Sequence, residues 1–215
     1  NYNNNEEITI PLDPTQTPSE NAQRNIAKDN KQKRTFEALT ELIQETADDI
    51  QYLESISNAL DIALSEADLA QIKEELMQSG YVRRKHTKKK VKLTSKPMHY
   101  ISSDGYDMYV GKNNLQNEEL TFSFANGNDW WFHAKGAPGS HVIVKSGGDE
   151  LPDRTFEEAG RLAAYYSKNR GSDKVEIDYI QKKHVKKPNG AKPGFVVYYT
   201  NYSLVIDSDI YNIKN

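Results

Sequence analysis

The spacing of apolar residues changes abruptly near Pro97, and this change constrains the fold more than any other feature of the chain. Before that point apolar residues recur every three or four positions, which is typical of amphipathic helices. After it they alternate with polar residues along short runs, which is typical of strands. A helical part followed by several strands and one helix predicts an α+β protein.

The helical part predicts an antiparallel helical hairpin, a coiled-coil arm over residues 19–80, because two periodic segments are joined by a short turn at residues 63–65. Ser19 is the expected N-cap of the first helix, and Gly80 is a natural residue to end the second. Heptad spacing predicts that the seam consists of Phe36, Leu39, Ile43, Ile50, Leu53, Leu60, Leu69, Ile72 and Leu76. The alternative is a pair of amphipathic helices packed onto a globular domain. Residues 1–18 are interpreted as a lead-in from a missing N-terminal domain.

Charge is strongly partitioned along the chain although the formal net charge is only −3. Residues 35–79 are acidic and contain a single base, Lys73, whereas residues 81–97 are basic and contain no acid. We interpret residues 81–97 as a basic linker. The chain has no cysteine, which excludes thiolate metal sites and fits a reducing cytoplasm. It also has no apolar run of membrane-spanning length and no secretory signal, so we expect no membrane insertion.

The part that follows, residues 98–215, predicts a mixed β-sheet with one main helix. The helix is expected over residues 155–168, with Thr155 as N-cap and Glu158 in a capping box. Gly160 costs this helix about 1 kcal/mol unless close packing requires it. The expected strands are residues 99–103, 106–111, 120–124, 130–134, 141–145, 175–181, 195–199 and 204–207.

A glycine loop lies between two of these strands, in the segment from Asp129 to Lys145. Its turn, Gly-Ala-Pro-Gly, is expected to present polar side chains at one end of the sheet. Glycines let a backbone approach a ligand, and a lysine beside exposed amides favours an anion. The alternative is an ordinary hairpin with tryptophans in the core and histidines on the surface. The residues concerned are His133, Lys135, Gly136, Gly139, Ser140 and His141.

No convergent catalytic constellation is visible, so we expect no enzymatic role, no metal and no cofactor. Asp129, His133 and His141 are three ligand types without a metal-binding spacing. Ser140 and His141 are adjacent in sequence, which does not make a nucleophile–base pair. Asn113 and Asn114 are interpreted as turn residues that tolerate positive φ.

Nucleic-acid binding is better supported, because lysine and arginine clusters neutralise phosphates. One cluster begins at Arg83 and Arg84. The other comprises Lys182, Lys183, Lys186, Lys187 and Lys192. The alternative for both is a solvated linker and a solvated loop.

Four motifs, in order, resemble the RNA-binding region (NFACT-R) of the RqcH/NEMF/FbpA family. They are Ile101–Glu118 with its Val-Gly-Lys-Asn-Asn-Leu-Gln-Asn turn, the Asp129–Lys145 run, the helix Glu158–Lys168 and the loop Val185–Gly194. The helical segment is similar to the family's coiled-coil arm. It keeps Asn21-Ala22-Gln23 but lacks the aromatic residues usual after them.

The resemblance implies a factor that binds tRNA and the obstructed large ribosomal subunit and promotes alanine tailing of stalled nascent chains in the cytoplasm. We expect the family's N-terminal domain to be missing from these residues. The resemblance also carries an alternative function, that of a surface adhesin which binds fibronectin or fibrinogen without a signal peptide.

Overall fold

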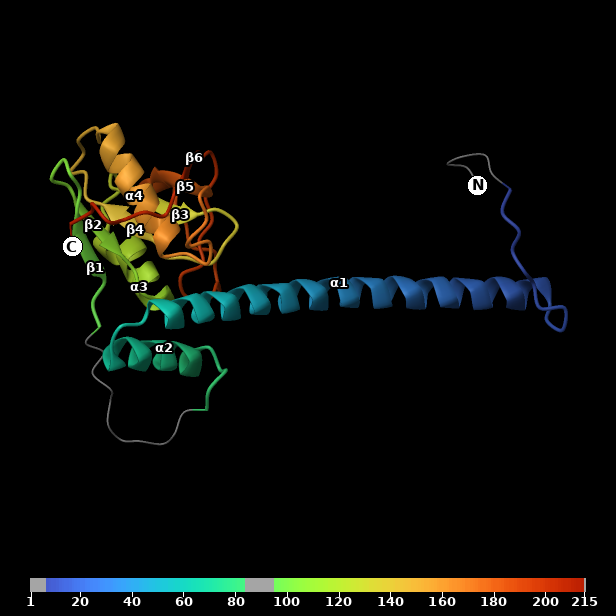
Figure 1. Cartoon of the computed structure of the whole chain (residues 1–215). Coiled ribbons are helices and arrows are strands. Elements are labelled where there is room, and N and C mark those ends of the chain that lie inside the picture. The colour runs from blue at the N-terminus through green and yellow to red at the C-terminus, as the bar shows by residue number, and fades with distance from the viewer. Residues whose placement is uncertain (1–6, 84–94, 215) are drawn as a thin grey trace. The chain divides into compact units, whose positions relative to one another are not determined.

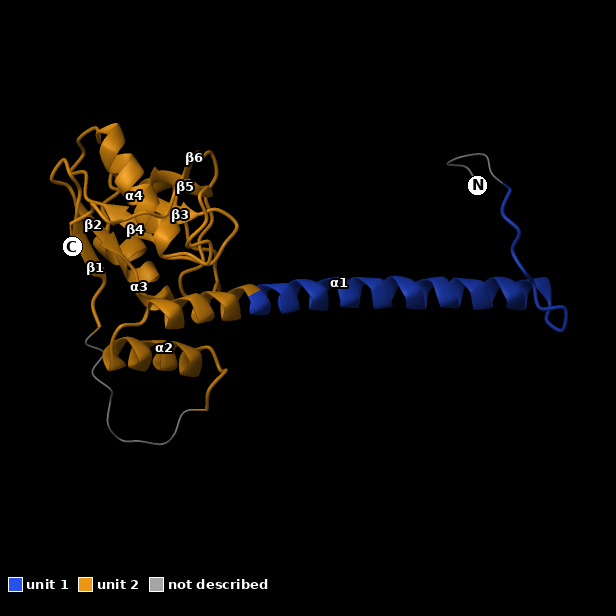
Figure 2. Ribbon diagram, viewed as in Figure 1, with its two compact units in different colours: residues 1–50 blue, residues 51–215 orange. Residues whose placement is uncertain are grey.

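The computed structural model describes residues 7–83 and 95–214 (Figure 1). The chain divides into two compact units, residues 1–50 and 51–215 (Figure 2). The boundary falls inside the long helix α1 (Pro18–Ile62). None of the helices in the described ranges is both long and apolar enough to cross a bilayer.

The start of α1 is fixed by a capping arrangement in the first unit. Thr17, not Ser19, is the capping residue: the Glu20 amide donates to Thr17 Oγ1, and Glu20 Oε2 accepts from the Thr17 amide at 2.7 Å. Pro18 then occupies the first helical position, where its missing N–H costs nothing. Asn21 is buried, and its side-chain amide donates to the carbonyl oxygen of Asp13 at 3.0 Å. The Asn21 of the family motif therefore ties the lead-in to the helix.

The predicted seam of α1 is not buried. Phe36, Ile43 and Ile50 are 72%, 68% and 55% exposed, so they have no packing partner among the described residues. The other exposed seam residues are Leu39, Leu53, Leu60 and Leu69.

The hairpin itself is present but short. Helix α2 (Glu66–Gln78) has 13 residues and is therefore about 20 Å long. Its Ile72 packs with Tyr52, Ile56 and Ala59 of α1, with Leu76 alongside. The buried seam of α1 therefore lies one residue earlier than predicted, at Tyr52 and Ala59 in place of Leu53 and Leu60. The Tyr52 hydroxyl also hydrogen-bonds to Glu75 and Ser79. Ser65 caps α2 in a capping box with Asp68.

The second unit contains one six-stranded sheet, in the order β1-β2-β4-β3-β5-β6. The α+β class is confirmed. The sheet is antiparallel and not mixed, since each strand pairing in the described residues is antiparallel. The strands are β1 (Met98–Ile101), β2 (Asp107–Val110), β3 (Trp130–Ala134), β4 (Val142–Val144), β5 (Val175–Gln181) and β6 (Tyr202–Ile206).

Helices cover both faces of this sheet. Helix α4 (Asp153–Tyr165) lies on one face and buries Leu162 against Phe132 and other side chains of that face. Gly160 of α4 sits where an added Cβ would lie 3.0 Å from Leu204 Cδ1, so close packing explains this glycine. The opposite face is covered by α3 (Asn114–Glu119), the π-helix η1 (Leu120–Phe124) and the segment after β5, which opens with the 3-10 helix η2 (Lys182–His184).

Three local predictions were wrong. Residues 120–124 alternate like a strand, yet they continue α3 as η1, with Leu120 and the adjacent Thr121 both buried. Residues 195–199 form only an isolated bridge, between Lys186 and Val197. Thr155 lies inside α4, where Pro152 is the N-cap, and its hydroxyl donates to Asp104 at 2.8 Å.

Candidate nucleic-acid interface

The glycine loop between β3 and β4 packs against the end of α4. The Ser140 amide donates to the Tyr166 carbonyl at 3.0 Å, and the Lys168 amide donates to the Pro138 carbonyl at 2.9 Å. A Cβ on Gly139 would lie 3.0 Å from Ser167 Cβ, so this glycine allows two backbones to approach each other. The loop is a folded turn that contributes to the interior, and the Ser140 amide is not available to a phosphate.

The two histidines of this segment form a pair in which His141 is buried and His133 is half-buried. The rings of His133 and His141 meet edge to face at 5.4 Å, and both contact Trp131. His141 is 2% exposed, and its Nδ1 lies 2.8 Å from Thr121 Oγ1. Burial lowers the pKa of His133 to about 4. Burial also holds the pKa of His141 well below its usual range, and the neighbouring His133 lowers it further.

These histidines are therefore neutral at physiological pH and offer no positive charge to a phosphate. The side chains of Ser140 and His141 are buried, so neither reaches the surface in this structure. Lys135 and Gly136 do lie at the surface, but the Lys135 ammonium contacts Glu176 Oε1 at 2.5 Å, and this contact raises the pKa of Lys135. Of the predicted loop residues, only these two are well exposed.

The late basic residues fall into two groups. Lys187 and Lys192 hold their loop in place: Lys187 Nζ contacts Glu118 at 2.7 Å, and Lys192 Nζ lies 4.6 Å from the centre of the Tyr52 ring. The second group comprises Lys182, Lys183 and Lys186, which we call the lysine edge. These three form no ion pair within residues 7–83 and 95–214, and Lys183 and Lys186 are exposed. Arg83 is exposed, whereas Arg84 and residues 85–94 lie outside the described part of the chain.

The asparagine-rich turn has a role that sequence reasoning missed. Asn113 has an extended backbone, with φ of −155°, and caps α3, so it does not use positive φ. Its side-chain amide donates to Gln71 of α2 at 2.8 Å. Asn114 likewise donates to Ser55 at 2.7 Å and to Glu75 at 2.9 Å. The turn therefore docks the helical hairpin onto the sheet domain.

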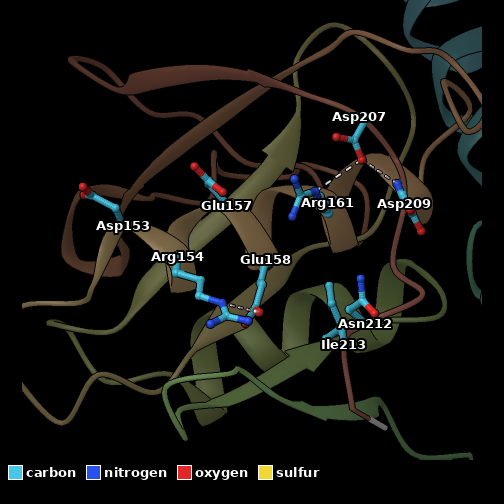
Figure 3. Close-up of a pocket in the computed structure, with 9 residues that line it drawn as sticks. All are labelled: Asp153, Arg154, Glu157, Glu158, Arg161, Asp207, Asp209, Asn212 and Ile213. Atoms are coloured by element: carbon cyan, nitrogen blue, oxygen red, sulfur yellow. Dashed lines mark hydrogen bonds and ion pairs between the residues drawn. The ribbon is translucent and has the colours of Figure 1, made fainter.

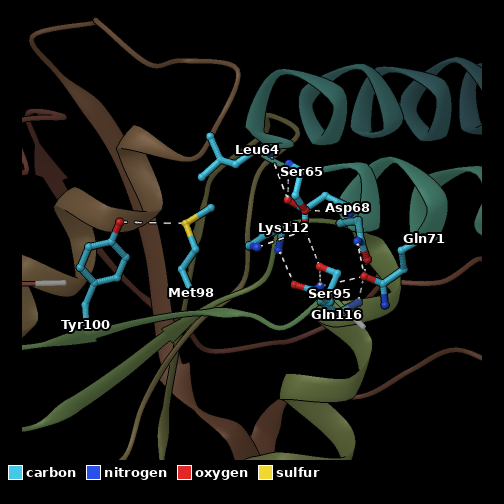
Figure 4. A network of polar contacts seen from close by, with 10 residues as sticks. Leu64, Ser65, Asp68, Gln71, Ser95, Met98, Tyr100, Lys112 and Gln116 are labelled. Atoms are coloured by element: carbon cyan, nitrogen blue, oxygen red, sulfur yellow. Dashed lines mark hydrogen bonds and ion pairs between the residues drawn. The ribbon is translucent and has the colours of Figure 1, made fainter. Parts of the chain in front are cut away.

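Figure 4 shows a second part of this docking contact, centred on Asp68. Lys112 Nζ lies 3.1 Å from Asp68, Ser95 donates to Asp68 at 2.5 Å, and Gln116 donates to Gln71 at 2.7 Å. Burial opposes ionisation of Asp68, but these donors and the Leu64 amide outweigh it and lower its pKa to about 2. The contact thus contains a buried ion pair whose partners are hydrogen-bonded.

Asn117 extends this contact to the glycine loop. Its Oδ1 accepts from the His141 amide at 3.0 Å, and its Nδ2 donates to the Gly139 carbonyl at 3.3 Å. A Cβ on Gly111 would lie 2.1 Å from Asn117 Oδ1, so Gly111 makes room for that bond. Two motifs of the sequence are therefore joined through one side chain. The sequence feature that could have indicated this docking role is the concentration of amide side chains in the turn, four within five positions.

Two other regions do not suit nucleic acid or metal. A cavity of about 610 Å³ beside α4 is lined by five carboxylates, whereas its two arginines are paired, Arg154 with Glu158 and Arg161 with Asp207 (Figure 3). Its negative charge repels phosphates. No three potential metal ligands cluster in the ranges that the structure describes. Asp129, the third residue considered for a metal, contacts Lys145 Nζ at 2.5 Å.

Comparison with known proteins covers nearly the whole chain. A family model for the NFACT N-terminal and middle domains matches residues 1–95, and a model for the NFACT protein RNA binding domain matches residues 96–200. The Rqc2 homolog RqcH of Streptococcus pneumoniae serotype 2 is 45% identical over 210 residues, which are 97% of this chain and 38% of that protein. The Rqc2 homolog RqcH of Bacillus subtilis is 42% identical over 205 residues, which are 94% of this chain and 35% of that protein. The chain thus spans little more than a third of these curated relatives.

A solved structure is also similar, that of the C-terminal of the fibronectin/fibrinogen-binding protein from Streptococcus suis. It shares 42% sequence identity with this chain and gives a TM-score of 0.83. The similarity covers 94% of this chain and 82% of that one.

Proposed function

Because this chain belongs to the NFACT family of RqcH-like proteins, we propose that it binds tRNA and the obstructed large ribosomal subunit in ribosome-associated quality control. In that role it contributes to alanine tailing of stalled nascent chains. The proposal is one of binding and not of catalysis, and it places the protein in the cytoplasm. The matched RNA-binding domain and the quality-control relatives support it.

The observation that carries the proposal is the lysine edge. Lys182, Lys183 and Lys186 follow β5 at one end of the sheet and have no carboxylate partner among the described residues. Such lysines can neutralise the phosphates of a nucleic-acid backbone and so release the cations condensed on that backbone. Because the histidine pair is neutral and Lys135 is paired, this edge offers a phosphate a better contact than the glycine loop does.

The test is tRNA binding and co-sedimentation with purified large subunits at two salt concentrations, about 50 and about 200 mM. Replacing Lys182 and Lys183 by Glu should weaken both interactions and lower the slope of log affinity against log salt by about two. Lys187 is a poor choice for this experiment, because its replacement would also break the contact with Glu118. The matched control replaces two other exposed lysines, Lys174 and Lys214, by Glu. Equal losses in both variants would argue against a defined edge.

A second candidate function, binding of fibronectin or fibrinogen at the cell surface, is favoured by one feature of the sheet. Strand β6 is an edge strand, and its Tyr202 and Val205 are 60% and 61% exposed. Edge strands of this kind can pair with an extended peptide. Binding that persists at high salt and is lost in Val205→Lys would support this function. Binding that disappears with salt would indicate nonspecific attraction to the lysines.

A further inference from the structure

A row of side chains crosses the sheet on the face opposite α4, and one end of this row is uncovered. The paired residues are His99, Tyr109, Ile143 and Trp131, which lie opposite one another on neighbouring strands β1, β2, β4 and β3. Ile143 and Trp131 are fully buried beneath η1 and the segment after β5. That cover stops at Phe124, the last residue of η1, so His99 and Tyr109 remain accessible.

The uncovered end consists of three rings in contact, His99, Tyr109 and Phe124, which we call the aromatic platform. The rings of His99 and Tyr109 are stacked with centres 4.7 Å apart and planes 21° apart. Phe124 meets Tyr109 at 4.7 Å with the planes at 68°. Phe124 is 41% exposed, so part of its ring is open to a ligand.

Cationic side chains lie at the same end of the sheet as this platform. Lys145 Nζ, which is paired with Asp129, lies 4.8 Å from the centre of the Phe124 ring. Lys182 Nζ lies 5.7 Å from the centre of the Phe122 ring, on the same short helix as Phe124. Lys183 follows, and its amide bonds to the Gly127 carbonyl in the loop after η1. The platform is therefore continuous with the lysine edge. At the end of the platform away from the lysine edge, the Asp107 carboxylate lies 2.6 Å from His99 Nε2.

We propose that the aromatic platform stacks unpaired RNA bases while the lysine edge contacts the phosphates of the same strand. This inference rests on the proposed RNA-binding function and specifies its ligand as single-stranded RNA. Exposed rings beside lysines are the usual means by which proteins bind single strands. A duplex offers no free base faces, so the platform adds nothing to duplex binding. Asp107 repels phosphates and so directs the backbone toward Lys182 and Lys183.

The test uses a short single-stranded RNA that carries a fluorescent adenine analogue, and the same sequence as a duplex. The unmodified chain should bind the single strand more tightly and quench the analogue. Phe124→Ala should reduce single-strand affinity about 5- to 100-fold, since base–aromatic stacking has that range. Duplex affinity and the salt slope should stay unchanged. Phe124→Leu keeps apolar volume against Tyr109 and should fold normally, but it should show the same selective loss.

The matched control is Tyr211→Ala, which removes a ring that is 91% exposed near the C-terminus. If Phe124→Leu binds and quenches like the unmodified chain while Lys182→Glu with Lys183→Glu loses binding, the platform is wrong and the electrostatic function stands. If the unmodified chain binds neither of these RNAs, the platform is wrong. If it also binds neither tRNA nor large subunits, the proposed function itself fails. If Phe124→Leu loses only binding to large subunits, the rings contact a ribosomal protein, and the RNA ligand is wrong.

Discussion

Acidification should destabilise the sheet domain through the neighbouring histidines His133 and His141. Burial lowers the pKa of His133 from 6.5 to about 4 in the folded chain. Between these values the unfolded chain binds a proton that the folded chain does not bind. The stabilising contribution of a neutral His133 is thus fully present above about pH 6.5 and is lost as the pH falls toward 4. His141, with a pKa also lowered by burial, acts in the same direction.

The magnitude follows from the two pKa values of His133. At pH 5 the unfolded imidazole is almost fully protonated and the folded one is almost fully neutral. The free energy of unfolding should therefore fall by about 2 kcal/mol between pH 7 and pH 5 from His133 alone. For a domain of this size such a loss is large enough to lower the melting temperature by about 4 to 8 °C.

The assay is urea unfolding at pH 7 and pH 5, followed by the fluorescence of the two tryptophans. The comparison is between the unmodified chain and His133→Gln, because groups such as Glu75 titrate in both chains and cancel. His184→Gln is the matched control, since its ring is exposed on η2. His133→Gln should be less pH-dependent by about 2 kcal/mol. An identical pH dependence in all three chains would refute the assignment to this pair.

The docking contact of the hairpin yields two further predictions. Burial raises the pKa of Glu75 above its ordinary value of 4.5, so the folded chain keeps a proton that the unfolded chain loses. The unmodified chain therefore loses stability as the pH rises through the raised pKa. Glu75→Gln should gain stability relative to the unmodified chain between pH 5 and pH 8, measured by thermal unfolding. Gly111→Ala places a Cβ on Asn117 Oδ1 and should cost about 1 to 3 kcal/mol in urea unfolding. Its matched control, Gly127→Ala, meets only Lys183 Cβ at 3.6 Å and should change stability by less than about 0.5 kcal/mol.

The sequence predicted the strands with clear period-two alternation, because their alternate side chains enter two separate cores. Trp131 and Phe132 are neighbours in β3, and each is fully buried, one on either face. The family resemblance is confirmed by the comparisons. Alternation of apolar and polar residues predicted a strand over residues 120–124, but the burial in the structure does not alternate: Leu120 and Thr121 are buried, whereas Ser123 and Phe124 are exposed. Periodicity also could not locate the hairpin seam, because the buried position belongs to Tyr52, whose hydroxyl needs a partner far along the chain.

The division of roles within the site follows from the same contacts. The motif residues Asn114, Asn117 and Gly139 build the junction between the hairpin, the turn and the glycine loop, and their polar atoms are engaged within the chain.

The side chains available to a ligand, Lys183 and Phe124, lie outside that junction, at the opposite end of β3 from the glycine loop. A change in the junction therefore acts on RNA binding through stability or through the placement of the hairpin, whereas a change at the lysine edge acts on the ligand directly. Loss of RNA binding in a variant of Asn114 would identify a contact residue only if its free energy of unfolding were unchanged. The stability must be measured because Asn114, alone among the asparagines of the turn, donates a hydrogen bond to the buried carboxylate of Glu75. A variant of Asn114 leaves this carboxylate short of a partner and so destabilises the fold.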